Sequence, residues 1–514
     1  MAAGIADVDQ VELTTERTFT ARRILVEAAL LGLLADGALR NAPDGLGWTL
    51  WVLALALVAL NVARSRGLAV TREQTAWLGA AVACATAFAW RDAEQLRAFN
   101  VLGTLVAFTM FAMCATGRPA ATIFATRVRD VAAAGLYTIR DIVGGAPVLA
   151  LFDAQLHRVS FVRRGASWTA LRAVLITAPL FLVFVLLLSR ADPVFASIFR
   201  LPQLDIEELV SHVAIIGAFG WWSAGYVRGA LLGVSRRPAL PEIPFRFGTA
   251  EITTSLGAVI ALFAIFVTLQ LRWLFGGADV VLATTGLTVA EYARRGFFEL
   301  VAVAALVVPL ILGTRAVIED EKVVRRHRAL SLALIILLAP IIASALLRMQ
   351  LYVSYFGLTT DRLYATALMI WLGIVFVFMT GTVLRGWTRP FAAMTMLSAF
   401  AALFTLNMIN PDLLVARVNL GRATAERTVD YQYLARLGGD AVPTVAKALA
   451  ATSQSVESCK AAELLRNRWL GDRAAGWNLG ARRAGEAVVA YLPPAMVSRL
   501  CGGMFNSSQG VPKQ

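Results

Sequence analysis

Residues 329–347, ALSLALIILLAPIIASALL, carry no charged side chain and form a run long enough to cross a bilayer as one helix. A membrane-spanning helix needs about 20 predominantly apolar residues to cross about 30 Å of hydrocarbon. Ten similar stretches occur along the chain, so the sequence predicts an all-α, polytopic transmembrane helical bundle of about eleven spans. The predicted spans are residues 24–39, 47–63, 75–90, 98–117, 168–189, 209–233, 250–275, 296–314, 329–347, 364–384 and 391–409.

The composition of the 514 residues agrees with this class, since 58% are hydrophobic and only 16% are charged. Soluble globular proteins average about 45–50% apolar and about 25% charged residues. The formal net charge is +14, and most of the arginines fall in short loops between the predicted spans. No basic segment interleaves with aromatic residues. The expected partner is therefore the lipid bilayer, with no nucleic acid.

The loop charges predict the orientation. Alternate loops, beginning with the N-terminal segment, hold more than twice as many Arg and Lys residues as the loops between them. Because cations accumulate on the cytoplasmic side, we expect a cytoplasmic N-terminus, and eleven crossings then place the C-terminus outside. Residues 1–23 are polar and no small-residue cleavage site follows the first apolar run, so that run is expected to be a retained span rather than a signal peptide.

These features divide the chain into six regions. We expect a cytoplasmic N-terminal tail (1–23), a four-span N-terminal bundle (24–117), a cytoplasmic amphipathic loop (118–167), a seven-span core bundle (168–409), an extracytoplasmic helical domain (410–505) and a disordered tail (506–514). Apolar positions between Val128 and Val143 follow helical spacing, which suits either a helix on the membrane surface or one packed under the bundle. Glycines 225, 229 and 233 share one face of the sixth span, which suits either internal packing or a dimer face.

Six stretches resemble a bacterial family of polytopic membrane proteins, the domain of unknown function number four-one-seven-three. They are residues 191–196, 270–277, 289–300, 355–359, 410–412 and 430–434, and they are spread over residues 190–435, roughly half of the chain. The most specific is Glu-Tyr-Ala-Arg-Arg-Gly-Phe-Phe-Glu at 291–299. The resemblance implies a multi-pass protein of the bacterial cytoplasmic (inner) membrane and brings no assigned activity.

A set of ionisable and polar residues near the outer ends of the spans forms a candidate site, the predicted outer cluster. Ionisable groups at membrane depth are costly and usually face a cavity or a partner. This pattern suits either an outward-facing cavity for an anionic or zwitterionic group, or a structural salt-bridge network. A helix break at Phe275-Gly276-Gly277 is expected to expose backbone amides. The cluster comprises Gln270, Arg272, Glu291, Arg294, Glu299, Arg348 and Arg362.

Other chemistry has little support in the sequence. No spacing of His, Cys, Asp and Glu resembles a metal site, and no phosphate-binding glycine loop or nucleophile elbow occurs, so we expect no metal and no cofactor. Cys459 and Cys501 both fall in the segment predicted to lie outside, where an oxidising compartment permits a disulfide.

Three functions remain. The favoured one is a non-enzymatic sensor or scaffold that presents the C-terminal domain to a membrane or periplasmic protein partner. The second is a secondary transporter of a small anionic or zwitterionic solute. The third is a membrane enzyme acting on a lipid-linked substrate, with Glu291 or Glu299 as the acid or base; an enzyme is the least favoured of the three.

Overall fold

The computed structural model describes residues 2–40, 45–115, 123–156, 206–233, 247–285, 297–423, 429–471 and 477–502, with four isolated positions between 177 and 188. Of residues 2–14, 206–207, 270–285 and 297–298 only the backbone is described. Throughout these ranges the regular secondary structure is helical, which confirms the predicted all-α class.

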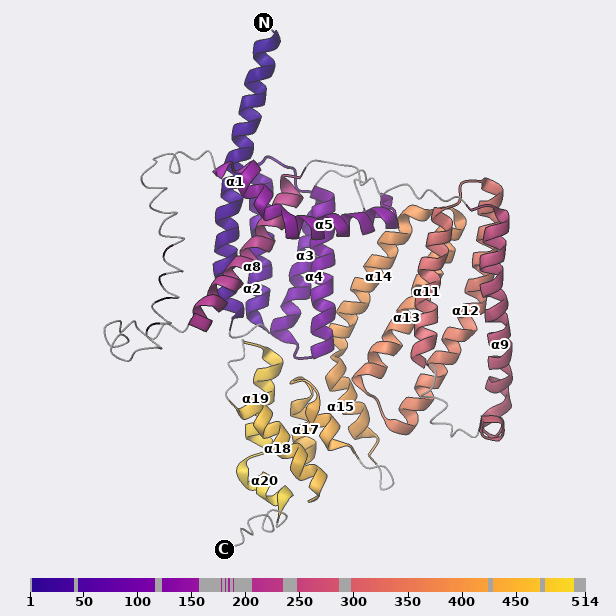
Figure 1. Cartoon of the computed structure of the whole chain (residues 1–514). Coiled ribbons are helices and arrows are strands. Elements are labelled where there is room, and N and C mark those ends of the chain that lie inside the picture. The colour runs from indigo at the N-terminus through magenta and orange to yellow at the C-terminus, as the bar shows by residue number, and fades with distance from the viewer. Residues whose placement is uncertain are drawn as a thin grey trace.

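Long helices run side by side and form the body of the molecule (Figure 1). Their bounds agree with the predicted spans to within a few residues at most ends. They are α1 (Ala2–Leu39), α2 (Leu46–Ser65), α3 (Arg72–Trp90), α4 (Glu94–Ala115), α8 (Ile206–Leu231), α9 (Thr249–Thr285), α11 (Phe297–Ala316), α12 (Glu321–Phe356), α13 (Thr360–Gly381) and α14 (Thr388–Ile409).

Eight helical segments in the described ranges are long and apolar enough to cross a membrane. Seven correspond to predicted spans, and the eighth is Val128–Asp153. Helices α1, α3 and α8 are long enough but are not among these eight, because they lack a stretch that is sufficiently apolar and poor in charge. The predicted span 168–189 lies almost wholly outside the described residues. Several long apolar helices thus indicate a membrane protein, while the described helices alone do not give eleven spans.

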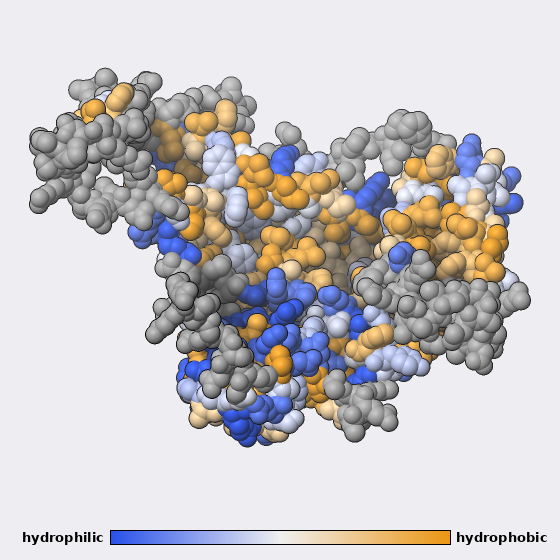
Figure 2. Space-filling model, turned by 60° about the horizontal axis from the view of Figure 1, so that its bottom comes forward, coloured by the Kyte–Doolittle hydropathy of each residue, from blue (hydrophilic) through white to orange (hydrophobic). Residues whose placement is uncertain are grey.

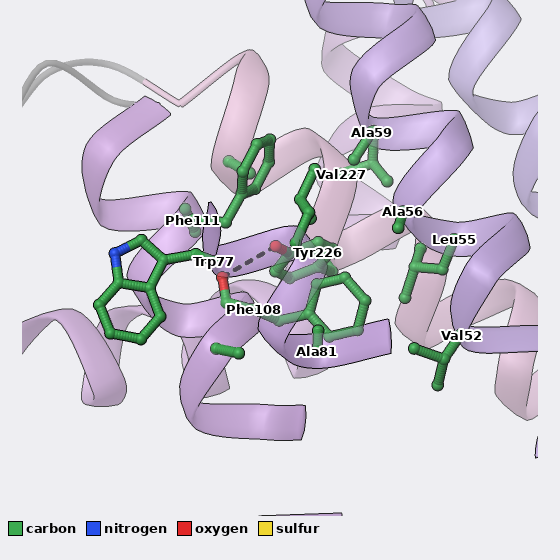
Figure 3. Close-up of a cluster of buried hydrophobic side chains, with 14 of the residues drawn as sticks. Val52, Leu55, Ala56, Ala59, Trp77, Ala81, Phe108, Phe111, Tyr226 and Val227 are labelled. Atoms are coloured by element: carbon green, nitrogen blue, oxygen red, sulfur yellow. Dashed lines mark hydrogen bonds between the residues drawn. The ribbon is translucent and has the colours of Figure 1, made fainter. Parts of the chain in front are cut away.

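The long helices pack around two hydrophobic cores. The first joins α1–α4 with α8 and includes Trp77, Phe108 and Phe111, which Figure 3 shows gathered around Tyr226. The Tyr226 hydroxyl donates a hydrogen bond to the carbonyl oxygen of Phe108 at 2.9 Å, so its polar end is satisfied inside the core. The second core joins α9 with α11–α13. Helix α14 bridges the two cores, because its buried residues contribute to both.

Helix α5 (Val128–Val148) lies across the upright helices near the end where α1 begins (Figure 1). A Cβ added to Gly225 of α8 would lie 2.3 Å from the carbonyl oxygen of Asp141, and one added to Gly229 would lie 2.5 Å from the Asp141 side chain. Small residues let helix backbones approach closely in this way. Internal packing of this glycine face against α5 is therefore confirmed, and the dimer-face alternative is not needed to explain it.

The opposite face of α5 is exposed and apolar, with Leu136, Ile139 and Val143 all well over half exposed. A short 3₁₀ turn, η1 (Ile123–Ala125), precedes α5, and the π-helical turn η2 (Leu149–Asp153) follows it. The helix consequently packs against α8 on one side and exposes an apolar face on the other.

The polar N-terminal tail is helical. Helix α1 runs without interruption from Ala2 to Leu39, so the tail 1–23 and the first span belong to one helix. The sequence contains no proline between these ends to interrupt the backbone hydrogen bonds. The predicted tail 506–514 lies outside the described residues.

The C-terminal helices gather around a third core at the end of the bundle opposite the start of α1 (Figure 1). Figure 2 turns this end forward and shows hydrophilic residues over these helices and hydrophobic residues on the flanks of the bundle. Cys459 and Cys501 form a disulfide here, with Cα atoms 4.7 Å apart. The helices are α15 (Pro411–Gly421), α16 (Tyr431–Arg436), α17 (Val442–Ala450), α18 (Val456–Leu470), α19 (Leu479–Tyr491) and α20 (Pro494–Cys501).

Candidate functional site

Three members of the predicted outer cluster are described with their side chains, and they lie on α11, α12 and α13. Glu299 is exposed in the first turn of α11, Arg348 is buried within α12, and Arg362 is partly buried in the first turn of α13. A carboxylate in the first turn of a helix is favoured by the helix dipole without any further partner.

Arg362 is engaged in local structure. Its guanidinium donates to the carbonyl oxygen of Gly357 and lies 3.9 Å over the ring centre of Tyr352, which ties α13 back to the end of α12. Gly357 has a φ of 83°, a left-handed conformation that favours glycine at the end of a helix. The Arg362 side chain thus fastens the turn between two spans.

For the remaining members of the predicted outer cluster, the structure describes the backbone at most. Gln270 and Arg272 lie in α9, where the backbone alone is described, and Glu291 and Arg294 lie outside the described residues. The expected break at Phe275-Gly276-Gly277 is wrong, because α9 stays helical through Thr285. Two glycines weaken a helix by about 1 kcal/mol each, too little to end one that other residues support. The cluster as a ligand site stays a prediction.

A second set of polar residues meets where the C-terminal helices contact the bundle, and we call it the polar junction. It consists of Asp92, Asp412, Asp440 and the backbone of Gly438–Gly439. Asp92 follows α3, Asp412 lies in the first turn of α15, and Asp440 lies between α16 and α17. The sequence analysis did not single out these residues as a site.

Backbone hydrogen bonds hold the polar junction together. The amide of Gly438 donates to Asp412 Oδ2 at 2.9 Å, and the amide of Gly439 donates to Asp92 Oδ2 at 2.8 Å. In return the amide of Asp92 donates to Asp440 Oδ2 at 3.1 Å. Charge-assisted bonds of this kind are stronger than neutral ones. They join residues separated by up to 348 positions in the sequence.

The two glycines are required by the close approach of the chains. A Cβ on Gly438 would lie 1.8 Å from the carbonyl oxygen of Asp92 and 2.5 Å from Asp412 Oδ2. A Cβ on Gly439 would lie 2.8 Å from both Asp92 Oδ2 and the indole of Trp469. No side chain fits at Gly438 unless the C-terminal helices move away from the bundle.

Burial and mutual repulsion set the protonation of the junction acids. Asp412 is 2% exposed, and this burial raises its pKa to about 6, with Asp440 and Asp92 adding to the effect and the Gly438 amide opposing it. Burial also raises the pKa of Asp440, although Arg91, 3.9 Å away, opposes that rise. Asp412 therefore changes its charge near neutral pH, where an exposed aspartate would already be ionised.

Asparagine side chains extend the polar contacts into the bundle. Asn100 of α4 and Asn407 of α14 exchange side-chain hydrogen bonds at 3.1 and 3.0 Å, and both are almost fully buried. The Arg91 side chain donates to the carbonyl oxygen of Asn407 at 2.7 Å. The Asn478 side chain donates to the carbonyl oxygen of Arg91 at 2.9 Å. In the sequence, an asparagine within an apolar run indicates a buried polar contact. The sequence did not show which residue is the partner, because Asn100 and Asn407 are 307 residues apart.

A small polar cavity of about 140 Å³ adjoins the junction. Acidic, basic and hydroxyl groups line it together, so it suits a few water molecules or a small zwitterionic group better than a single ion. No residue of the predicted outer cluster lines this cavity, and none lines the larger cavity at the start of α14. Its lining includes Asp92, Glu94, Arg97, Thr360, Asp412, Tyr433, Arg436 and Arg468.

One group in the described part of the chain has the proximity expected of metal ligands, namely Cys459, Glu463 and Cys501. The two sulfurs are bonded to each other, so they are not thiolates and do not ligate a metal in this state. The group therefore gives no metal site.

Residues 78–448 match the family described as a domain of unknown function, DUF4153. The chain belongs to this family. The predicted membership of a domain-of-unknown-function family is confirmed, whereas the predicted family number, four-one-seven-three, is wrong. The matched range covers most of the long helices, both partners of the asparagine pair, and Asp92, Asp412 and Asp440. No curated protein and no solved structure matches the chain.

Proposed function

We propose that this DUF4153 protein is a non-enzymatic membrane module of the sensor or scaffold type. In this proposal an eleven-span bundle with a cytoplasmic N-terminus holds the C-terminal helices on the extracytoplasmic side of a bacterial inner membrane. There the helices form a domain that meets a membrane or periplasmic protein partner. The loop charges support the orientation, and the placement of the C-terminal helices opposite the start of α1 agrees with it.

The observation that carries the proposal is the polar junction. The C-terminal helices have a hydrophobic core of their own, yet they are fixed to the bundle at Asp92, whose carboxylate accepts the Gly439 amide and whose amide donates to Asp440. Asp412 of α15 accepts the Gly438 amide beside these contacts. A domain tethered only by a linker would need no such contacts. The arrangement favours a module whose bundle and outer domain act as one body.

The use of the junction acids also favours a non-enzymatic role. A general acid or base must be free to exchange a proton with a substrate. The junction carboxylates instead accept hydrogen bonds from Gly438, Gly439 and Asp92, which are groups of the protein itself.

A secondary transporter of a small anionic or zwitterionic solute is the second candidate. It is favoured by the division of the long helices between two hydrophobic cores, since many transporters move one helical unit against another. Uptake by proteoliposomes that contain the purified chain, compared with empty liposomes, tests it directly.

The decisive experiment compares four forms of the chain in the native host, each with its membrane abundance measured. They are wild type, a deletion of residues 412–514, Glu299→Gln and Arg348→Gln. The proposal expects the deletion alone to lose function at normal abundance. If either point variant accumulates normally and behaves as the null strain does, the predicted outer cluster is a functional site and the scaffold proposal fails.

A further inference from the structure

A larger open cavity of about 650 Å³ lies near the other end of the molecule, where α5 and α14 both begin. Its lining comes from two segments, Phe124–Arg127 before α5 and Gly386–Pro390 at the start of α14. The apolar span Thr388–Ile409 begins at this cavity, which places it at the edge of the membrane rather than in its middle.

The cavity carries two arginines with no partner in the described part of the chain. Arg127 and Arg389 are exposed, and neither guanidinium makes an ion pair or hydrogen bond there. The nearest acid along the chain, Asp130, is occupied: it accepts from the backbone amide of Arg127 and lies 3.6 Å from the guanidinium of Arg129.

Other arginines near the same end behave differently. Arg17 and Arg228 both bind Asp153, at 2.9 and 2.5 Å, and Arg22 donates to the carbonyl oxygen of Ala154 at 3.1 Å. These cations serve internal contacts. The pair at the cavity therefore stands apart as positive charge that the protein has not neutralised.

One helix end adds further positive potential. At the N-terminal boundary of α14, Trp387 makes no capping hydrogen bond, so the amides of Thr388 and Arg389 have donors to offer. Helix N-termini of this kind bind phosphate. The start of α5 is different, because the Asp130 carboxylate already accepts from the Arg127 amide there. Beneath the start of α14, the guanidinium of Arg328 comes within 3.0 Å of the Cβ position of Gly386, and its buried Nε lacks a hydrogen-bond partner among the described residues.

Aromatic side chains complete the cavity. Trp387 is 67% exposed and Phe124 is 52% exposed, and both line it. Tryptophan is enriched where a span meets the interface between headgroups and acyl chains. Cations beside exposed aromatic rings, at the end of an apolar span, match a ligand that has both a phosphate and a hydrocarbon chain.

We propose that this cavity binds the phosphate headgroup of an anionic phospholipid from the leaflet on the side where α1 begins. Arg127 and Arg389 pair with the phosphate, the first-turn amides of α14 donate to it, and Trp387 and Phe124 contact the glycerol and the upper acyl chains. The bound lipid links α5, which lies across the bundle, to α14, which joins the two cores.

Native mass spectrometry of the full chain in neutral detergent tests this proposal. The protein is incubated with phosphatidylglycerol or with phosphatidylcholine, and the retained lipids are counted. We compare wild type with Arg127→Gln/Arg389→Gln and with the control Arg325→Gln/Arg326→Gln, which removes the same charge from exposed positions on α12. We expect wild type to retain phosphatidylglycerol preferentially, the cavity variant to bind it about 30-fold more weakly, and the control to match wild type.

Several results would overturn the proposal: equal retention of phosphatidylcholine, an equal loss in the control variant, or competition by millimolar inorganic phosphate, which would identify free phosphate as the ligand. A second measurement guards against misfolding of the double variant. A photoreactive benzoylphenylalanine at position 124 of the otherwise wild-type chain should cross-link to phosphatidylglycerol, and failure to do so also contradicts the proposal.

Discussion

The predicted outer cluster and the polar junction lie toward the same end of the bundle, yet they are built in different ways. Arg362 fastens the turn next to it, and Glu299 is exposed at a helix start. Asp92, Asp412 and Asp440 come from three separate segments, and each carboxylate accepts a hydrogen bond from a backbone amide of another segment. A charged residue near the end of a span shows only that this end of the helix is polar. A buried carboxylate that accepts an amide from a distant segment marks an interface.

The largest expected effect tests whether the C-terminal helices fold as a separate unit. Replacing Cys459 and Cys501 with serine removes a cross-link between residues 42 positions apart. We expect the C-terminal helices to lose about 2–4 kcal/mol of unfolding free energy, because the cross-link restricts their unfolded chain. Denaturant unfolding followed by limited proteolysis measures this loss.

For this variant the bundle should keep its own protection from proteolysis, and Cys114→Ser should leave the C-terminal helices unchanged. Simultaneous loss of the bundle would show that the two regions are one folding unit, and the comparison would then break down.

The next effect concerns the close approach at the polar junction. Gly438→Ala forces the backbones of Gly438 and Asp92 apart, because the added Cβ would lie 1.8 Å from a carbonyl oxygen. We expect destabilisation of the docked state by about 3 kcal/mol, the upper range for overpacking. Limited proteolysis of the C-terminal helices, compared between variant and wild type, reports the undocking.

Gly485→Ala is the matched control in α19, since its Cβ would meet only the carbonyl oxygen of Trp469 at 3.6 Å. This control should be neutral or slightly stabilising, because alanine favours a helix more than glycine does. Equal effects of the two substitutions would contradict the account of the junction.

A smaller effect that distinguishes the junction from the predicted outer cluster is a dependence of stability on pH. The folded protein raises the pKa of Asp412 to about 6, so between about pH 4 and pH 6 the folded state binds more protons than the unfolded one. The C-terminal helices are therefore most stable at acidic pH and lose stability as pH rises through this window, by an amount on the order of 2 kcal/mol. The stability of the C-terminal helices, measured at pH 4 and pH 7, gives this difference.

Asp412→Asn should remove most of that pH dependence, since an amide can accept the Gly438 bond without ionising. The exposed carboxylate variant Glu457→Gln serves as the control and should keep it. A pH dependence that survives in Asp412→Asn would assign the titration to another group.

The smallest effect is expected at Glu299. Glu299→Gln removes an exposed charge from the first turn of α11, which is worth less than about 1 kcal/mol. The thermal midpoint of the bundle should change by no more than a few degrees. A larger loss would show that Glu299 has a buried partner, and the contrast between the two regions would become weaker.

The sequence was sufficient for features that depend on local pattern. Apolar runs predicted the helices from α2 to α14 closely, and glycines four apart predicted the packing face at Gly225 and Gly229. Local pattern did not predict the polar junction. Asp92, Asp412 and Asp440 are ordinary loop or helix-start residues in the sequence, and they become a site only when the fold buries them together. The cavity at Arg127 and Arg389 has the same origin, since its two sides are separated by more than 250 residues.

Hydrogen exchange at residues 437–442 tests the central claim most directly. In the full chain the amides of Gly438 and Gly439 donate to Asp412 and Asp92, so they should exchange slowly. In Asp92→Ala/Asp412→Ala they should exchange at least about tenfold faster, corresponding to about 1.4 kcal/mol, while α18 keeps its protection. Equal exchange in wild type and variant would contradict docking through the polar junction.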